Sequence, residues 1–196
     1  MKTNTHFRNT ILFVFITFTF GNCKNNNLEE EIFNNTYNKF HGRYKLTKST
    51  ASEPVDMNFD EKKSYDLLSE IPSLSNTYLQ LNVYKGGNIF TQFWQEPYFK
   101  KSYDNFPVDF NPENIVMDYN LQAESHFFEF TSDLKKIKVI RNKNSGSTDY
   151  KWTLPESVNV VSDELIEIIT NRKMYTSDGV KMIKITSLYK RYQKFT

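Results

Sequence analysis

Residues 165–193 read LIEIITNRKMYTSDGVKMIKITSLYKRYQ, and this stretch decides the fold class. It is rich in Ile, Thr, Tyr and Met, and the first three of these residue types favour β-strands. Asp178 and Gly179 stand between its two halves, and both accept the positive φ that a tight hairpin turn needs. We therefore predict a strand over 165–176, a turn, and an antiparallel partner strand over 180–193.

The same β-rich composition extends back to Gly42, with turn residues at fairly even intervals. Prolines 97, 107 and 112 cluster between Glu96 and Asn114, which we interpret as a long loop because prolines collect where strand pairing stops. Further hairpin turns are predicted at 85–88, at Gln122-Ala123 and at Ser132-Asp133. The other predicted strands cover residues 42–49, 77–84, 89–95, 115–121, 124–131, 134–141 and 150–154.

Eight or nine strands in one meander leave exposed edges unless the sheet closes on itself. We therefore predict an all-β fold, a small antiparallel up-and-down barrel with a short N-terminal helix. An open β-sandwich is the alternative that the same pattern permits. The helix is expected within residues 28–38, where Leu28, Ile32 and Phe33 share a face, after a polar tether.

The first 22 residues have the features of an export signal. Lys2 and Arg8 precede an apolar run at 11–20, which is too short to span a membrane as a helix of about 20 residues. The single cysteine, Cys23, follows after Gly21 and Asn22. This arrangement resembles the lipobox of bacterial lipoproteins, which implies a lipid anchor on Cys23. The alternative is a secreted protein cut near Gly21 that keeps a free thiol.

On this interpretation the chain consists of a lipoprotein signal peptide at 1–22, a tether and short helix at 23–39, and one barrel domain at 40–196. The membrane is then a partner through the anchor, and we expect an outer-membrane protein that faces the periplasm or the cell surface. The acidic run at 28–31 resembles the tags that send some lipoproteins to the surface, with a solvated spacer as the alternative.

The charge balance of the chain argues against a nucleic-acid partner. The chain has 25 Lys and Arg, of which Lys2 and Arg8 belong to the leader, so 23 remain against 23 Asp and Glu. A nucleic-acid binder usually has a basic excess or a basic face. We therefore expect no nucleic-acid partner, and the oligomeric state stays open.

Three further stretches resemble lipocalin-like domains of bacterial surface lipoproteins. Residues 40–46, FHGRYKL, resemble the opening of lipocalin-like barrels, which implies that Tyr44 is a core residue at the closed end. Residues 54–70, with PVDMNFD and then SYDLLSE, resemble a segment of those lipoproteins, and LYKRY at 188–192 resembles their last strand. The resemblance implies a calyx-shaped barrel that binds a small apolar molecule and has no catalytic residue.

The segment around residue 58 also suggests a cation. Asp56, Asn58 and Asp60 place oxygen-bearing side chains at alternate positions, as the first half of a calcium loop does. The second half is missing, because Glu61 replaces the turn glycine and Leu67 replaces the bidentate acid. The alternative is a turn in which these side chains bond to their own backbone.

Catalytic constellations are absent from the sequence. The histidines are His6, His41 and His126, and none has the neighbours that a zinc site or a catalytic triad requires. We expect no enzymatic activity and no cofactor.

Aromatic residues are concentrated in one predicted strand and the loop after it. The two-residue period of a strand places Phe90 and Trp94 on one face and Phe93 on the other. These aromatics either touch a ligand at a barrel mouth or cap the core. The candidate ligand-binding residues are Phe90, Phe93, Trp94, Tyr98, Phe99 and Tyr103. We expect a small apolar ligand, and the alternative is a structural or protein-interaction lipoprotein whose barrel is filled.

Overall fold

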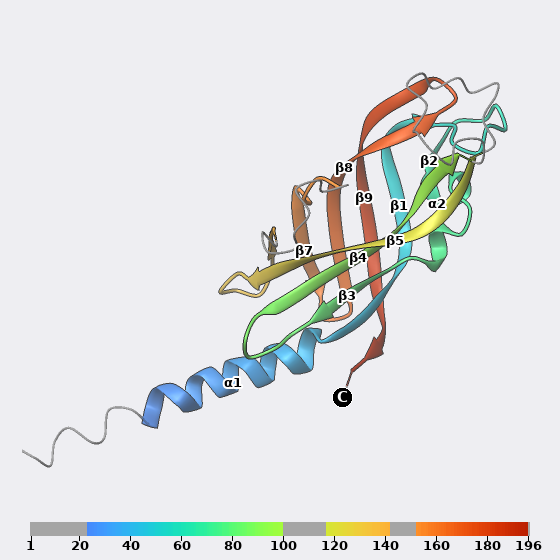
Figure 1. Ribbon diagram of the computed structural model, residues 1–196. Coiled ribbons are helices and arrows are strands. Elements are labelled where there is room, and N and C mark those ends of the chain that lie inside the picture. Colours follow the sequence, from blue (N-terminus) through green and yellow to red (C-terminus); the bar gives the residue numbers. More distant parts are fainter. Residues whose placement is uncertain (1–22, 100–116, 142–151, 196) are drawn as a thin grey trace, which may run out of the picture.

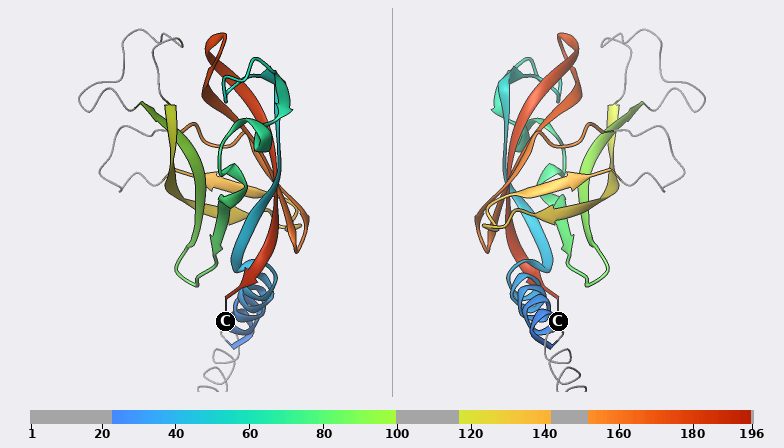
Figure 2. Two further views of the ribbon diagram at one scale, coloured as in Figure 1. Left: turned by 90° about the vertical axis from the view of Figure 1, so that its right-hand side faces the viewer. Right: turned by 90° about the vertical axis from the view of Figure 1, so that its left-hand side faces the viewer.

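The computed structural model describes residues 23–99, 117–141 and 152–195. Within these residues an antiparallel sheet of nine strands curls into a nearly closed barrel (Figure 1). One long helix projects from the base of this barrel, and the C-terminal end lies at the same base in both side views of Figure 2. The all-β barrel predicted from the sequence is therefore confirmed.

The described chain contains three helical segments and nine strands. The helices are α1 (Cys23–Phe40), α2 (Leu67–Glu70) and the 3-10 turn η1 (Leu74–Asn76). The strands are β1 (Gly42–Val55), β2 (Ser64–Asp66), β3 (Tyr78–Asn82), β4 (Asn88–Phe99), β5 (Met117–Phe130), β6 (Ile137–Ile140), β7 (Ser157–Ser162), β8 (Leu165–Thr176) and β9 (Gly179–Lys194).

The sheet is an up-and-down meander with the order β6-β5-β4-β3-β1-β9-β8-β7. β1 pairs with both β3 and β9, and its far half also pairs with β2. The two end strands meet where Lys136 bridges Asn159, and the Val160 N–H donates to the Lys135 carbonyl at 2.8 Å. These contacts bring the two end strands of the sheet together and nearly close the barrel.

Side chains alternate between the interior and the outside, as the pleat of a strand requires. Along β8, every second residue from Ile166 to Thr176 is buried. Tyr44 is completely buried, and its hydroxyl donates to the Phe40 carbonyl at 3.0 Å, which ties the start of β1 to the end of α1. The Arg191 guanidinium of β9 lies 5.8 Å from the centre of the Tyr44 ring.

The predicted hairpins at 85–88, at Ser132-Asp133 and at Asp178-Gly179 are confirmed by the antiparallel pairing of the strands they join. The predicted turn at Gln122-Ala123 is wrong. β5 is one continuous strand in which Gln122 faces Trp94 and Ala123 faces Phe93 of β4. Neither Gln nor Ala favours the positive φ of a two-residue hairpin, so nothing reverses the chain there.

Other boundaries differ from prediction as well. β4 continues through Pro97, which faces Tyr119 of β5. Pairing of β4 with β3 stops at Gln92, so the missing N–H of Pro97 can lie on the side without a partner. Residues 152–154 are outside any strand, and β7 begins only at Ser157. α1 starts at Cys23, where a non-helical tether was expected, while the rest of the predicted 96–114 loop lies outside the described residues.

The close approach of β1 to β9 yields a test at Gly42. A Cβ at this position would fall on the backbone carbonyl oxygen of Gln193. We expect Gly42→Ala to lower the free energy of unfolding by about 1–3 kcal/mol, as overpacking against backbone does. Gly86→Ala is the control, since a Cβ there meets open space, and its effect should stay within about 0.5 kcal/mol. Equal unfolding free energies of the two variants in urea titrations would contradict the close packing at Gly42.

Candidate functional site

The predicted ligand-binding aromatics are not brought together as one group. Phe90 and Trp94 point into the barrel and are buried. Phe93 points outward and stacks on Tyr78 of β3, with ring centres 3.9 Å apart. Tyr98 donates a hydrogen bond from its hydroxyl to Asp118 at 3.0 Å. The Phe99 side chain and Tyr103 lie outside the described residues.

A buried arginine joins Trp94 to a second tryptophan. The Arg172 guanidinium of β8 lies 4.4 Å from the Trp94 ring centre and 4.3 Å from the Trp152 ring centre. Its Nη1 donates to Glu96 Oε1 of β4 at 3.3 Å. Cation–π contacts with two rings stabilise a desolvated cation to an extent that neither ring alone does. β4 and β8 are not neighbours in the sheet, and the Arg172 side chain therefore connects them across the interior of the barrel.

A carboxylate of β5, Glu124, lies near this arginine, and His126 of the same strand contacts that carboxylate. Glu124 faces Gln92 of β4, and His126 Nε2 lies 3.4 Å from Glu124 Oε1. Burial lowers the pKa of Arg172, while the nearby Glu96, Tyr189 and Glu124 raise it. We call Arg172, Trp94, Trp152, Glu96, Glu124 and His126 the interior cluster.

Several polar atoms of the interior cluster are buried without a hydrogen bond to any described residue. Among them are both carboxylate oxygens of Glu124, Nε of Arg172 and Nε1 of Trp152. Native proteins leave few buried polar groups unsatisfied, because each costs about 1–3 kcal/mol. These unbonded atoms therefore mark the place inside the barrel where water or a ligand is most needed.

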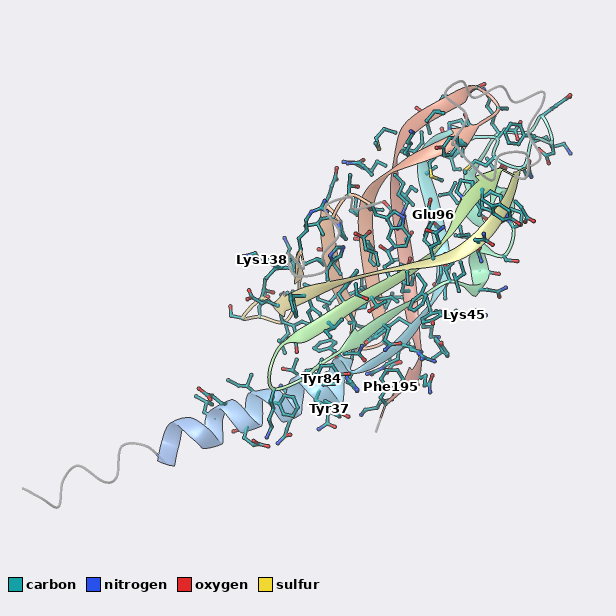
Figure 3. The ribbon with its side chains drawn as sticks, viewed as in Figure 1. Tyr37, Lys45, Tyr84, Glu96, Lys138 and Phe195 are labelled. Carbon is teal, nitrogen blue, oxygen red and sulfur yellow. The ribbon has the colours of Figure 1, made fainter. Side chains whose placement is uncertain are left out.

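One small cavity lies beside the cluster among the described residues. A cavity of about 10 Å³ adjoins Arg172, Trp94 and Glu96, with Met57 and Met174 among its other walls. Figure 3 shows Glu96 among the strands, well away from α1. That volume holds about one water molecule, so a larger molecule in this cavity requires neighbouring side chains to move.

Arg172, Trp152 and Glu124 were not among the site residues predicted from the sequence. Arg172 stands in the buried register of β8 between Thr170 and Met174, and a charged residue at an inward position of an alternating strand is the signal that marks it. No comparable signal exists for Trp152, which lies in a segment without regular structure.

A second hollow lies outside the barrel, between α1 and the hairpins at the base. This base groove has a volume of about 1010 Å³ and is lined by Ile32, Phe33, Tyr84, Phe130 and Leu134, among others. The carboxylates of Glu29 and Glu129 also line it. Ile32 and Tyr84 are at least half exposed, so the groove presents apolar surface to solvent.

Aromatic packing holds α1 against the barrel near this groove. The His41 ring stacks on Tyr37 at 4.4 Å and contacts Tyr84 and Phe195 edge-on, and Figure 3 shows these three neighbours gathered at the junction. His41 Nδ1 accepts a hydrogen bond from the Val83 N–H at 2.9 Å. Burial lowers the pKa of His41, which favours the neutral ring that this bond requires.

The residues of the partial calcium pattern do not converge. Asp56 is buried, whereas Asn58 and Asp60 are exposed. Asn58 Oδ1 accepts from the Asp60 N–H at 3.1 Å, and Asp60 Oδ1 accepts from the Lys62 N–H at 2.9 Å. Within the described residues no three acidic, histidine or cysteine side chains are placed to hold a metal ion. The geometry is that of side chains bonded to their own backbone.

The nearby SYDLLSE stretch braces the same loop. Asp66 caps α2 by accepting from the Leu68 N–H at 3.0 Å. Glu70, at the end of α2, is buried and accepts from the Met57 N–H at 2.9 Å. This hydrogen bond joins two segments that are 13 residues apart, so Glu70 has a structural role here.

Comparison with protein-family models, with curated proteins and with solved structures finds no match for this chain. No helix in residues 23–99, 117–141 and 152–195 has the length and apolar character needed to cross a membrane.

The buried Glu70 carboxylate predicts a pH effect on stability. Burial raises the pKa of Glu70 above its ordinary value of 4.5, with Asp56 and Asp60 adding to the rise and the N–H groups of Met57 and Asn58 opposing it. A raised acid pKa stabilises the fold fully below about pH 4.5, and this contribution is lost as the pH rises through the folded-state pKa. Wild type should therefore lose stability relative to Glu70→Gln between pH 4 and pH 7.

Urea unfolding of both proteins at pH 4, 5, 6 and 7 measures this difference. Glu61→Gln, which removes an exposed carboxylate of the same loop, is the control. Glu70→Ala should cost about 1–3 kcal/mol at every pH, because it leaves the Met57 N–H buried without an acceptor. Parallel curves for wild type and Glu70→Gln would show that burial of this carboxylate has no energetic consequence.

Proposed function

We propose that this chain is a lipid-anchored protein of the cell envelope that binds a small molecule inside its barrel without transforming it. The binding site is the interior cluster, with Phe90 and Trp94 as apolar walls. The anchor is the acylated Cys23, and the location is the outer membrane, with the barrel in the periplasm or at the cell surface.

The observation that carries the binding function is the set of unbonded atoms on Glu124, Arg172 and Trp152. A barrel selected for stability alone would fill these positions with apolar side chains, because a partly satisfied polar network is worse than an apolar core. Retaining two carboxylate oxygens, a guanidinium Nε and an indole N–H without hydrogen-bond partners is the pattern expected of a site whose partners arrive with a ligand.

The anchoring function is supported by the charged and apolar leader followed by Cys23. Cys23 is also the first residue of α1, and α1 leaves the barrel at its base (Figure 1). A lipid on Cys23 would therefore hold the base toward the membrane and leave the interior cluster on the far side. This orientation suits a site that takes up a ligand from the aqueous phase.

A second candidate function is favoured by the base groove. Its apolar side chains and the carboxylates of Glu29 and Glu129 fit a protein segment with an apolar face and Lys or Arg residues at its edge. On this alternative the chain is a protein-interaction lipoprotein and the barrel is filled. The two functions differ in whether the purified protein carries a small molecule.

The binding function predicts a co-purifying molecule. Protein purified from its native cells under mild conditions, then unfolded in organic solvent, should release a small molecule at close to one per chain in mass spectrometry. The Glu124→Leu variant should release much less, because its cluster lacks the carboxylate. If wild type repeatedly releases no stoichiometric molecule, the base-groove alternative is preferred.

The anchor predicts a change in location. Wild type should sediment with membranes, and Cys23→Ser should shift most of the protein to the soluble fraction, because the sulfur that carries the lipid is gone. Metabolic labelling with a fatty-acid analogue should mark wild type alone. Unchanged membrane association of Cys23→Ser would refute the anchor while leaving the binding function untouched.

A further inference from the structure

The unbonded atoms of the interior cluster differ in hydrogen-bond type. The two oxygens of a carboxylate such as that of Glu124 only accept, whereas Nε–H of Arg172 and Nε1–H of Trp152 only donate. A bound group that satisfies them all must therefore both donate and accept. The unbonded atoms thus restrict the chemistry of the group that completes the site.

The charges of the interior cluster restrict the chemistry of the bound group further. Arg172 is positive, and the carboxylates of Glu96 and Glu124 lie around it. A carboxylate or phosphate on the ligand would accept from Arg172 and Trp152 but would meet the negative charge of Glu124. An ammonium group would donate to Glu124 but would face Arg172 and leave both donors unsatisfied.

From this we infer that the barrel binds an amphiphile with a neutral, hydroxyl-bearing head group, such as a diol or other polyol, which donates to Glu124 and accepts from Trp152 and Arg172. This inference rests on the proposed binding function and adds the class of ligand. A hydroxyl group has one donor and two acceptor lone pairs, so two adjacent hydroxyls supply both types of partner.

The surroundings of the cluster are consistent with an apolar body on such a ligand. The cavity beside Arg172 is also walled by Met57, Ile71 and Met174. Methionine side chains adopt many shapes and re-pack around a guest more readily than branched side chains do. Movement of these side chains is a direct way to enlarge a space of about 10 Å³ into one that takes an alkyl chain.

Three probes of equal chain length test the head group. They are 1-monooctanoyl glycerol, octanoate and octylamine, titrated below micelle formation into the full chain carrying Cys23→Ser. The sequence contains two tryptophans, Trp94 and Trp152, and both contact Arg172, so tryptophan fluorescence reports on this cluster directly. We expect the glycerol ester to bind at least about tenfold more tightly than either charged probe.

Two variants test the residues. Glu124→Gln should weaken binding of the glycerol ester about tenfold, because one acceptor is replaced by a donor. Glu53→Gln, which changes an exposed carboxylate of β1 outside both the interior cluster and the base groove, is the matched control and should bind as wild type does. Trp152→Phe removes a single donor and, with Trp94 still reporting, gives an independent measurement if Glu124→Gln folds poorly in circular dichroism.

The outcomes separate the inference from the proposed function. Equal binding of the three probes, tightest binding of a charged probe, or no loss in both variants would overturn the neutral head group and leave ligand binding intact. Absence of binding by every probe, together with no co-purifying molecule, would overturn the binding function itself and assign buried water to the cluster.

Discussion

The pairing of β1 with both β3 and β9 is the constraint on which the rest of the structure depends. Residues near the start of the domain and residues near its end are neighbours there, with Gly42 facing Lys194. Only with this strand in place can inward side chains from both halves of the meander share one interior. The close approach at Gly42, the buried Tyr44 and the aromatic contacts around His41 all follow from where β1 begins.

The interior of the barrel has an apolar part and a charged part. Toward the base it is apolar, with Phe40, Phe128 and Leu81 fully buried. Farther from α1 it contains a cation between two indoles and two carboxylates. An interior of this kind stabilises the fold less than an apolar one of the same volume, since desolvating charges offsets much of their mutual attraction. Such an arrangement is typical of a place where binding, more than stability, determines the residues.

The barrel could be predicted because alternation and turn chemistry agree along β8 and β9, and because Asp178-Gly179 specifies a hairpin. The interior cluster could not, since the pairing of β8 with strands across the barrel is not written in any local pattern. Phe90 and Phe93 looked equivalent, as both faces of β4 carry aromatic bulk, and only the register separates them. The turn predicted at Gln122-Ala123 was wrong because polar and small residues also occur within a long, twisted strand.

The seam, where the end strands β6 and β7 come together, is the place where the barrel is expected to open most readily. In the described chain the seam contains one bridge, between Asn159 of β7 and Lys136 just before β6, and one additional backbone hydrogen bond, whereas β8 and β9 pair without interruption over twelve positions. Amide exchange would therefore be fastest along the seam and slowest in the β1–β9–β8 sheet. A transient lateral opening there would give solutes a side entrance to the interior, and would briefly expose strand edges to self-association.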